Sequence, residues 1–225
     1  MDRRFLTILI ALFLVFIGVF AFTRHSADKK SSGNGGQVTN HVIGQGHAGV
    51  TLIEYGDYQC PICQIYYQPL KQVYTQLASQ IYFQFRNLPL SSAHPNAFAG
   101  ARAAEAAGLQ NKYWEMHDKL YGNQTAWAGS SDPLTIFKSY AAVLGLNVDQ
   151  FASDYASSKV NDAINADVAA FTKTGQQAAT PTLFLDGKVL KNTDLIDPQS
   201  GVPSADKISQ IINDEIAKKQ PKPGG

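Results

Sequence analysis

The chain has 225 residues and is 44% hydrophobic, which suffices for one domain with a sizeable core once both ends are set aside. Its 19 Lys and Arg residues nearly balance 18 Asp and Glu residues, so the formal net charge is +1. This balance provides no basic surface for nucleic acid, and we expect no nucleic-acid partner.

The first segment is apolar and follows two cations. Arg3 and Arg4 precede an apolar run at residues 5–22, which is close to the roughly 20 residues that span a bilayer as a helix. We predict an uncleaved membrane anchor at residues 1–24, because a signal peptide has only about 7 to 15 apolar residues. A cleaved signal ending near residues 19–21 is the alternative. Either way, the two cations favour export of the rest, to the periplasmic or extracellular face of the cell membrane.

Small and polar residues dominate the next segment and the C-terminal end. Residues 25–40 contain almost no large apolar side chain and predict a flexible linker. Residues 219–225 contain two prolines and two glycines and predict a disordered tail. The folded domain is therefore expected at residues 41–218.

The first part of this domain reads as a strand, a helix and a second strand. Residues 50–55 form a short apolar run of strand-forming residues. Apolar residues recur at helical spacing over 61–78, with Pro61 at the favoured first helical position. Pro69 lies inside this helix and is expected to bend it. Residues 81–86 alternate like a second strand.

The rest of the domain reads as a block of helices followed by a hairpin and a last helix. Residues from about 95 to 175 are rich in helix formers and are broken by glycines. Strands at 181–185 and 189–190 flank an Asp-Gly hairpin signal at 186–187. An amphipathic helix is predicted over 204–218. The predicted order is βαβ, a helical block and ββα, an α/β fold class.

The two cysteines of the chain lie three residues apart at the start of the predicted helix, in Cys60-Pro-Ile-Cys63. This spacing places both on one face, within disulfide reach. Cys60, at the helix N-terminus, meets free N–H groups and the positive end of the helix dipole, which favour its thiolate. A stabilised thiolate favours the reduced form, so the disulfide becomes a better oxidant. Cys63, one turn deeper, is the candidate resolving thiol.

Three other interpretations of the pair remain open. A structural disulfide would close so short a loop that it stabilises little. Half of a zinc site would need further ligands, but there is no second cysteine pair and the five histidines lack ligand spacing. The pair could also be two unrelated buried cysteines. We favour a redox-active Cys60–Cys63 disulfide, with no metal and no separate cofactor.

Two further positions bear on this chemistry. Glu54, on the strand before the cysteines, is a candidate general base for Cys63, and the alternative is a solvated acid at a strand end. Thr180-Pro181 precedes a predicted strand. Because X-Pro bonds adopt cis at modest cost, a cis turn is plausible there, and an ordinary trans proline is the alternative.

An ordered set of motifs resembles the DsbA-like thiol–disulfide oxidoreductases, in particular their membrane-anchored bacterial members. The set consists of Glu54, Cys60-Pro-Ile-Cys63, Arg86-Asn-Leu-Pro-Leu, His94-Pro-Asn-Ala, Tyr113-Trp-Glu-Met-His117 and Thr180-Pro-Thr-Leu-Phe-Leu-Asp-Gly. The resemblance covers roughly residues 40–218. It implies a thioredoxin-like fold with a helical domain inserted at about 95–175, preceded by a transmembrane helix.

The resemblance also implies roles for the site residues. Cys60 would be the exposed nucleophile, Cys63 the resolving thiol and Glu54 the buried acid beneath them. Pro181 would be cis, would lie against the cysteine pair and, with Thr180, would offer backbone to an extended client peptide.

Other motif positions extend the site or surround it. Pro61 and Ile62, between the cysteines, complete the predicted substrate-binding set. The strongest oxidase of the family has histidine where this chain has Ile62, so we expect a less acidic Cys60 and a weaker oxidant. Trp114, Met116 and His117 are expected to pack in the core and not to take part in catalysis.

The function implied is an enzyme that introduces disulfides into unfolded or reduced exported proteins. A quinone-linked membrane partner of the DsbB or VKOR type would reoxidise it, and the protein would be a monomer. Two alternatives remain open, a disulfide reductase or isomerase on the same scaffold and a tethered peptide-binding chaperone.

Overall fold

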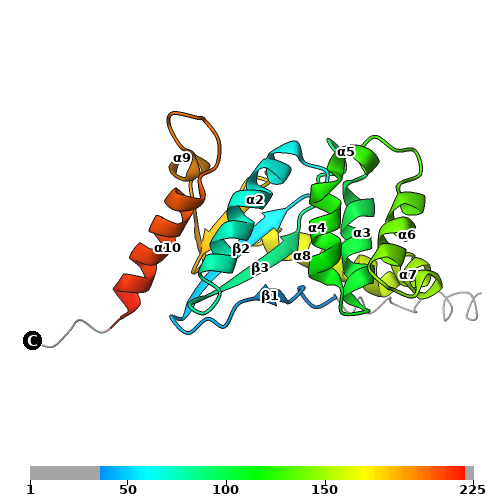
Figure 1. The fold of residues 1–225 in the computed structure, drawn as a ribbon, viewed down its shortest axis with the longest axis horizontal. Coiled ribbons are helices and arrows are strands. Elements are labelled where there is room, and N and C mark those ends of the chain that lie inside the picture. Colours follow the sequence, from blue (N-terminus) through cyan, green and yellow to red (C-terminus); the bar gives the residue numbers. More distant parts are fainter. Residues whose placement is uncertain (1–35, 221–225) are drawn as a thin grey trace, which may run out of the picture. The chain divides into compact units, whose positions relative to one another are not determined.

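The structure is a computed structural model and describes residues 36–220 (Figure 1). The predicted anchor at residues 1–24 and most of the predicted linker and tail lie outside the described residues. Within residues 36–220, no helix combines the length and the apolar character that a membrane span requires.

Five strands form one mixed sheet, in the order β1-β3-β2-β4-β5. They are β1 (His41–Ile43), β2 (Val50–Gly56), β3 (Ile81–Asn87), β4 (Thr182–Leu185) and β5 (Lys188–Val189). β2 and β3 pair in parallel, and the other three pairs are antiparallel. The helix α2 (Pro61–Gln76) connects the parallel pair and continues past Pro69. The βαβ and ββα halves predicted from the sequence are confirmed.

The N-terminal edge of the sheet differs from the sequence interpretation. β1 was not predicted, and it pairs with β3 through contacts such as His41 opposite Phe85. Thr39, which the sequence interpretation assigned to the linker, is buried. Its backbone N–H and its hydroxyl both donate to the carboxylate of Asp167, at 2.9 and 2.7 Å. The ordered fold therefore includes residues ahead of position 41.

Six helices between β3 and β4 form the predicted helical insertion. They are α3 (Ala97–Gly108), α4 (Tyr113–Gly122), α5 (Gln124–Trp127), α6 (Pro133–Val143), α7 (Val148–Tyr155) and α8 (Ser158–Thr172). Side chains of Asp132, Asn147 and Ser157 accept hydrogen bonds at the starts of α6, α7 and α8. Eight of the 12 residues of the alanine-rich α3 are buried, and its small side chains allow the neighbouring helices to pack closely.

The last part of the chain completes the fold as predicted. Asp186 and Gly187 form the turn between β4 and β5 with φ angles of 48° and 79°. This left-handed conformation is what an Asp-Gly hairpin turn requires. The short helix α9 (Asn192–Leu195) precedes α10 (Ala205–Lys219), which begins at a Ser204 cap and buries an isoleucine face.

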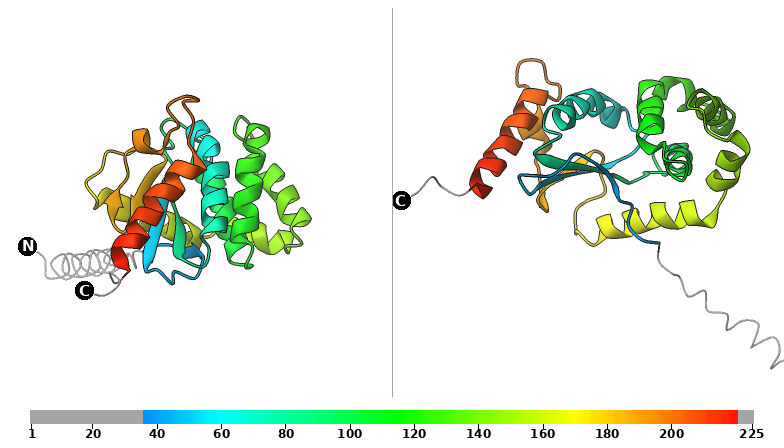
Figure 2. Two further views of the ribbon diagram at one scale, coloured as in Figure 1. Left: turned by 60° about the vertical axis from the view of Figure 1, so that its left-hand side comes forward. Right: turned by 60° about the horizontal axis from the view of Figure 1, so that its bottom comes forward.

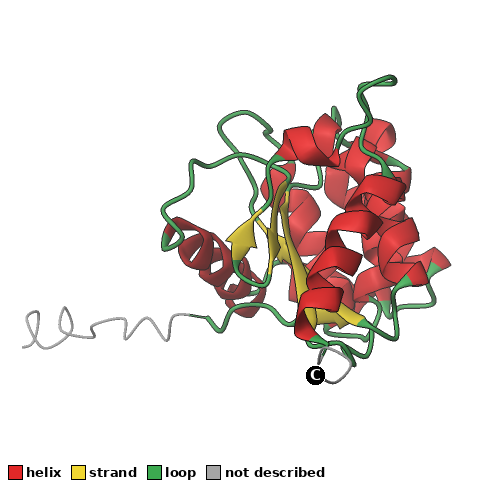
Figure 3. Cartoon of the chain, turned by 90° about the vertical axis from the view of Figure 1, so that its left-hand side faces the viewer, coloured by secondary structure: helices red, strands yellow, loops and turns green. Residues whose placement is uncertain are grey.

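Helices cover both faces of the sheet (Figures 2 and 3). α2 and α10 lie on one face, and α8 crosses the other face, as the right-hand view of Figure 2 shows. The larger hydrophobic core lies on the α2 side and continues into the insertion. A smaller core on the α8 side contains Tyr55, Leu88, Phe171 and Phe184. The mixed α/β, thioredoxin-like fold with a helical insertion is thus confirmed.

Candidate functional site

The cysteine pair lies where β2 passes into α2. Cys60 is the residue immediately before the helix, Pro61 is the first helical residue, and Cys63 lies in the first turn. Both cysteines are free thiols in this structure. Cys60 is 5% exposed and Cys63 is fully buried. The expectation that Cys60 is an exposed nucleophile is therefore wrong for this form of the protein, because neighbouring segments cover most of its surface.

The surroundings of Cys60 favour its thiolate. Hydrogen bonding from the Cys63 thiol is the largest cause and lowers the pKa of Cys60 to about 5, although burial opposes this change. The side chain of Thr180 and the backbone N–H groups of Ile62 and Cys63 lower this pKa further. The hydroxyl of Thr180 is buried with no other hydrogen-bond partner among the described residues, so it is available as a donor. When protonated, the Cys60 thiol donates to the carbonyl oxygen of Thr180 at 3.5 Å.

The pKa of the second cysteine, Cys63, is shifted in the opposite direction. Burial raises the pKa of the Cys63 thiol well above its ordinary value, and the neighbouring Cys60 and Glu54 act in the same direction. At neutral pH the pair therefore consists of one thiolate and one thiol. This asymmetry matches a nucleophile that starts an exchange and a resolving thiol that needs a proton acceptor.

Glu54 lies on β2, beneath the turn that carries the cysteines. It is 2% exposed, and its Oε1 atom has no hydrogen-bond partner among the described residues. Burial raises the pKa of Glu54 to about 8, and the negative charge of Cys60 adds to the effect. The alternative of a solvated acid at a strand end is therefore wrong. A carboxyl group with this pKa can gain and lose a proton near neutral pH, as a general acid or base requires.

The Thr180–Pro181 peptide bond is cis, so the alternative of an ordinary trans proline is wrong. Antiparallel pairing of β4 with β2 places Thr182 opposite Tyr55 and Leu183 opposite Glu54. This register brings the residues just before β4 to the turn that follows β2. The structure thus brings Thr180, the residue bonded to the cis proline, beside Cys60.

Around the cysteines, part of the helix surface is apolar and open to solvent. Pro61 and Ile62 are exposed, with Ile62 at 49%, and Ile65 one turn further along α2 is 47% exposed. The two predicted substrate-binding residues between the cysteines are thus part of an exposed apolar surface. The isoleucine at position 62 provides neither a charge nor a hydrogen-bond donor to the thiolate.

Asp57, which the sequence interpretation did not identify, organises the turn before Cys60. Its side chain is buried. One carboxylate oxygen accepts from the backbone N–H of Gln59 at 2.8 Å, and the other accepts from Leu90 N–H at 3.0 Å and pairs with His94 Nδ1 at 2.7 Å. The sequence signal was available, because Asp57 directly follows β2 and His94 belongs to one of the motifs that carry the resemblance.

A side chain from the insertion supports the same turn from the other side. The amide Nε2 of Gln124, on α5, donates to the carbonyl oxygens of Tyr58 at 2.8 Å and Cys60 at 3.0 Å. The amide of Gln59 donates to the carbonyl oxygen of Ala128 at 2.7 Å. The backbone around Cys60 is therefore held by residues of both the thioredoxin-like part and the insertion.

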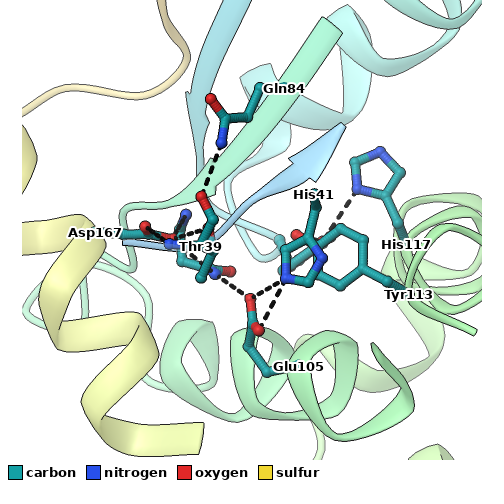
Figure 4. A network of polar contacts seen from close by, with 9 residues as sticks. Thr39, His41, Gln84, Glu105, Tyr113, His117 and Asp167 are labelled. Atoms are coloured by element: carbon teal, nitrogen blue, oxygen red, sulfur yellow. Dashed lines mark hydrogen bonds and ion pairs between the residues drawn. The ribbon is translucent and has the colours of Figure 1, made fainter. Parts of the chain in front are cut away.

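A buried polar network links the sheet to the insertion behind the site (Figure 4). The amide Nδ2 of Asn87 donates to Glu105 Oε1 at 2.7 Å and to Asp167 Oδ2 at 3.2 Å. His41 Nε2 lies 2.9 Å from Glu105 Oε2, and the His41 ring stacks on Tyr113 with 3.4 Å between centroids. These contacts join β1 and β3 to α3, α4 and α8.

The three positions expected to pack in the core do so. Met116 and His117 are buried, and Trp114 packs against the larger core. Burial lowers the pKa of His117 to about 3, so its ring is neutral at physiological pH. His117 Nδ1 lies 3.0 Å from the hydroxyl of Tyr58, which satisfies one ring nitrogen. Among residues 36–220, no group of three or more His, Cys, Asp or Glu side chains is placed to hold a metal ion.

Solved structures of DsbA-type proteins share this fold. Oxidised BdbD of Bacillus subtilis is 21% identical, with a TM-score of 0.66 over 81% of this chain and 97% of that chain. A thioredoxin-like oxidoreductase from Silicibacter pomeroyi is 23% identical, with a TM-score of 0.62 over 80% of this chain and 92% of that chain. α-DsbA1 of Wolbachia pipientis is 20% identical, with a TM-score of 0.62 over 81% of this chain and 94% of that chain. The DsbA-like fold inferred from the motifs is confirmed.

Curated relatives are similar over part of their length. The Na(+)/H(+) antiporter NhaA 1 of Mycolicibacterium gilvum is 37% identical over 156 residues, which are 66% of this chain and 24% of the antiporter. NhaA 1 of Salinispora arenicola is 36% identical over 149 residues, or 66% of this chain and 22% of the antiporter. The chain thus spans about a quarter of the length of these relatives.

A family model described as thioredoxin matches residues 36–214, a range that contains Glu54, both cysteines and Pro181. This range includes all five strands of the sheet and the whole insertion. The chain therefore belongs to the thioredoxin family.

Proposed function

We propose that this protein is an extracytoplasmic thiol–disulfide oxidoreductase that introduces disulfides into exported proteins through Cys60 and Cys63. The observation that carries the proposal is that the pKa values of the two thiols are shifted in opposite directions. The pKa of Cys60 is lowered to about 5, whereas that of Cys63 is raised well above its ordinary value. A leaving group of low pKa departs readily, so a client is released easily from Cys60.

In the proposed reaction, a client thiolate attacks the sulfur of Cys60 in the Cys60–Cys63 disulfide. The S–S bond breaks, a client–Cys60 disulfide forms, and Cys63 leaves and takes a proton from Glu54. A second client thiolate then attacks the client sulfur, and Cys60 leaves as a thiolate. The client loses two electrons and gains a disulfide, and the Cys60–Cys63 pair gains those two electrons.

The reduced pair must then return to the disulfide. A quinone-linked membrane partner of the DsbB or VKOR type would accept the two electrons, with Cys60 attacking its disulfide. Cys63 then attacks Cys60 and passes its proton to Glu54. In this proposal the segment at residues 1–24 anchors the protein, the part of the linker ahead of residue 36 gives the domain reach, and the enzyme works as a monomer at the outer face of the membrane.

Clients would bind in an extended form across Thr180 and Pro181 and over Pro61 and Ile62. Because the cis Pro181 precedes β4 and cannot extend its ladder, the backbone groups there are free to pair with a peptide. The exposed Ile62 and the neighbouring Ile65 would contact apolar client side chains, which are accessible in unfolded proteins.

The test uses the full chain with reduced, unfolded ribonuclease A as the client. The oxidised protein should restore ribonuclease activity, and Cys60→Ser should abolish this effect. Cys63→Ser is the matched control, because it cannot hold the internal disulfide and should also fail to oxidise the client. Its Cys60 should still attack added glutathione disulfide, forming a mixed disulfide and releasing glutathione, which Cys60→Ser cannot do. Oxidation of the client with Cys60→Ser equal to that of the unmodified protein would refute the proposal.

A second measurement separates the alternative functions. Alkylation of the thiols in intact cells should find the Cys60–Cys63 pair mostly as a disulfide if the protein is an oxidase. A pair that is mostly reduced would indicate a reductase or isomerase. Prevention of client aggregation that survives Cys60→Ser, with no thiol exchange, would indicate a chaperone.

A further inference from the structure

A pocket of about 400 Å³ lies on the face of the sheet that α8 covers. Side chains alternate between the two faces of a strand, so Tyr55 points into this pocket while the adjacent Glu54 points toward the cysteines. Phe184 of β4 and Ala170 of α8 form apolar walls. Thr174 lies on the exposed segment that follows α8 and lines the rim of the pocket. The pocket is therefore separate from the redox site.

Arg86 is the one charged side chain among the described residues that line this pocket. Its guanidinium donates to the hydroxyl of Tyr55 at 2.8 Å and to the side-chain oxygen of Gln84 at 3.3 Å. Both acceptors are neutral, and the Nε atom of Arg86 is buried with no hydrogen-bond partner among the described residues. No carboxylate within residues 36–220 forms an ion pair with Arg86.

The positive charge of the partly buried Arg86 guanidinium is therefore not balanced by a negative side chain among the described residues. Its planar set of donors matches the two oxygens of a carboxylate, and the interaction gains strength away from bulk water. The Arg86 group also lies 5.7 Å from the centre of the Tyr55 ring, which holds it against the wall of the pocket. A cationic ligand would be repelled by Arg86, and a neutral ligand would leave the charge without a partner.

We propose that this pocket binds a small organic acid that carries one carboxylate and an apolar body, such as an aromatic ring. The carboxylate pairs with Arg86, and the apolar body packs against Ile53, Phe184 and Val189. The volume of about 400 Å³ is within the range of pockets for small ligands. Thr174 and Gln176 provide polar groups at the opening. The inference does not depend on the proposed redox function.

Phenylacetate is a suitable probe, and phenylacetamide is its neutral counterpart of nearly the same shape. Binding to the full chain is measured by calorimetry, and the position is mapped by chemical-shift changes of backbone amides. We expect saturable binding of phenylacetate, at least about 10-fold tighter than that of phenylacetamide, as one charge-assisted interaction predicts. The shifts should concentrate around Tyr55, Arg86 and Phe184.

Three variants sharpen the test. Arg86→Met removes the charge at similar length and should weaken phenylacetate binding about 10-fold while leaving phenylacetamide unchanged. Ala170→Phe keeps the arginine but fills the pocket, and it should abolish binding of both probes. Lys173→Met is the matched control, because Lys173 is an exposed cation near the pocket that does not line it, and its removal should leave binding unchanged.

Thermal unfolding establishes that each variant is folded. If Arg86→Met fails to fold, Ala170→Phe and the comparison of the two probes still decide the question. The proposal is overturned if phenylacetate shows no saturable binding, if it binds no tighter than phenylacetamide, or if folded Ala170→Phe binds it normally. Replacement of both Cys60 and Cys63 by Ser should leave binding intact, so failure of the redox proposal is distinguishable from failure of this one.

Discussion

The sulfur of Cys60 lies 3.5 Å from the carbonyl oxygen of Thr180, a residue 120 positions further along the chain. The antiparallel pairing of β2 with β4 produces this approach, since Cys60 follows the C-terminal end of β2 and Thr180 precedes the N-terminal end of β4. The thiol therefore meets both the start of a helix and the backbone next to a cis proline. Both halves of the thioredoxin-like fold are needed to form its environment.

The hydrogen bond from Cys63 is the largest cause of the lowered pKa of Cys60. Cys63→Ala should therefore raise the pKa of Cys60 from about 5 toward its ordinary value. Cys63→Ser retains a hydroxyl donor and is the control that should preserve most of the shift. Thiolate absorbance at 240 nm, followed across a pH titration, measures the change. An unchanged pKa in Cys63→Ala would show that the helix N-terminus and Thr180 suffice.

The reduced protein should be more stable than the oxidised protein at pH 7. The thiolate of Cys60 contributes to folding stability because its pKa falls from 9.0 to about 5 in the folded state. This contribution is complete above the ordinary thiol pKa and is lost as the pH falls toward 5. After allowance for solvent screening, we expect a difference of about 1–2 kcal/mol at pH 7.

Paired thermal melts of the two redox forms at several pH values measure this difference. The gap between the two melting temperatures should amount to several degrees, about 2–4 °C for each kcal/mol in a chain of this size. It should widen between pH 5 and pH 9 and close below pH 5. A more stable oxidised form at pH 7 would contradict the oxidase assignment.

Glu54→Gln should slow the step in which Cys63 attacks a mixed disulfide at Cys60. The carboxylate form that accepts the proton of Cys63 becomes populated as the pH rises through the pKa of Glu54, about 8. In the unmodified protein the rate of this step should rise over that range, and the variant should lose this rise. We expect a loss of about 100-fold, at the low end of the usual range for general-base catalysis.

Rapid acid quenching of a mixed disulfide between Cys60 and a model peptide follows that step directly. Formation of the same mixed disulfide is the internal control, since it depends on Cys60 and should change little in Glu54→Gln. If the variant resolves the mixed disulfide at the normal rate and with the normal pH dependence, Glu54 is not the proton acceptor.

Asp167→Ala should destabilise the junction between the sheet and the insertion. The carboxylate of Asp167 accepts hydrogen bonds from the backbone N–H groups and side chains of both Thr39 and Asn87. Its removal leaves several buried donors without an acceptor, which we expect to cost about 2–4 kcal/mol. Urea unfolding measures the loss, and Asp162→Ala is the control because Asp162 is an exposed residue of the same helix.

Much of the fold could be predicted from local sequence patterns. The strand, the cysteine pair and the helix beginning at Pro61 are adjacent in sequence, so spacing and residue type identified them. The Asp186-Gly187 turn was identified in the same way. β1 was missed because its three residues follow a glycine-rich stretch, and only pairing with the distant β3 makes them a strand.

The residues of the site could be predicted from the sequence, but their burial and their contacts in the folded protein could not. The burial of Glu54 and the covering of Cys60 depend on packing of the second half of the chain over the first. The role of Asp57 depends on Leu90 and His94, which approach it only in the folded protein. The pocket around Arg86 likewise combines β2, β3, β4 and α8, so no local pattern marks it.

The two hydrogen bonds from Gln124 to the carbonyl oxygens of Tyr58 and Cys60 connect the insertion directly to the turn that carries the reactive sulfur. The inserted helices are a structural brace for the reactive turn as well as a cover for it. A shorter or rearranged α5 would release those carbonyls and change the angle at which the sulfur is presented. Redox behaviour in this protein should thus be sensitive to remodelling of a helix that contains neither cysteine.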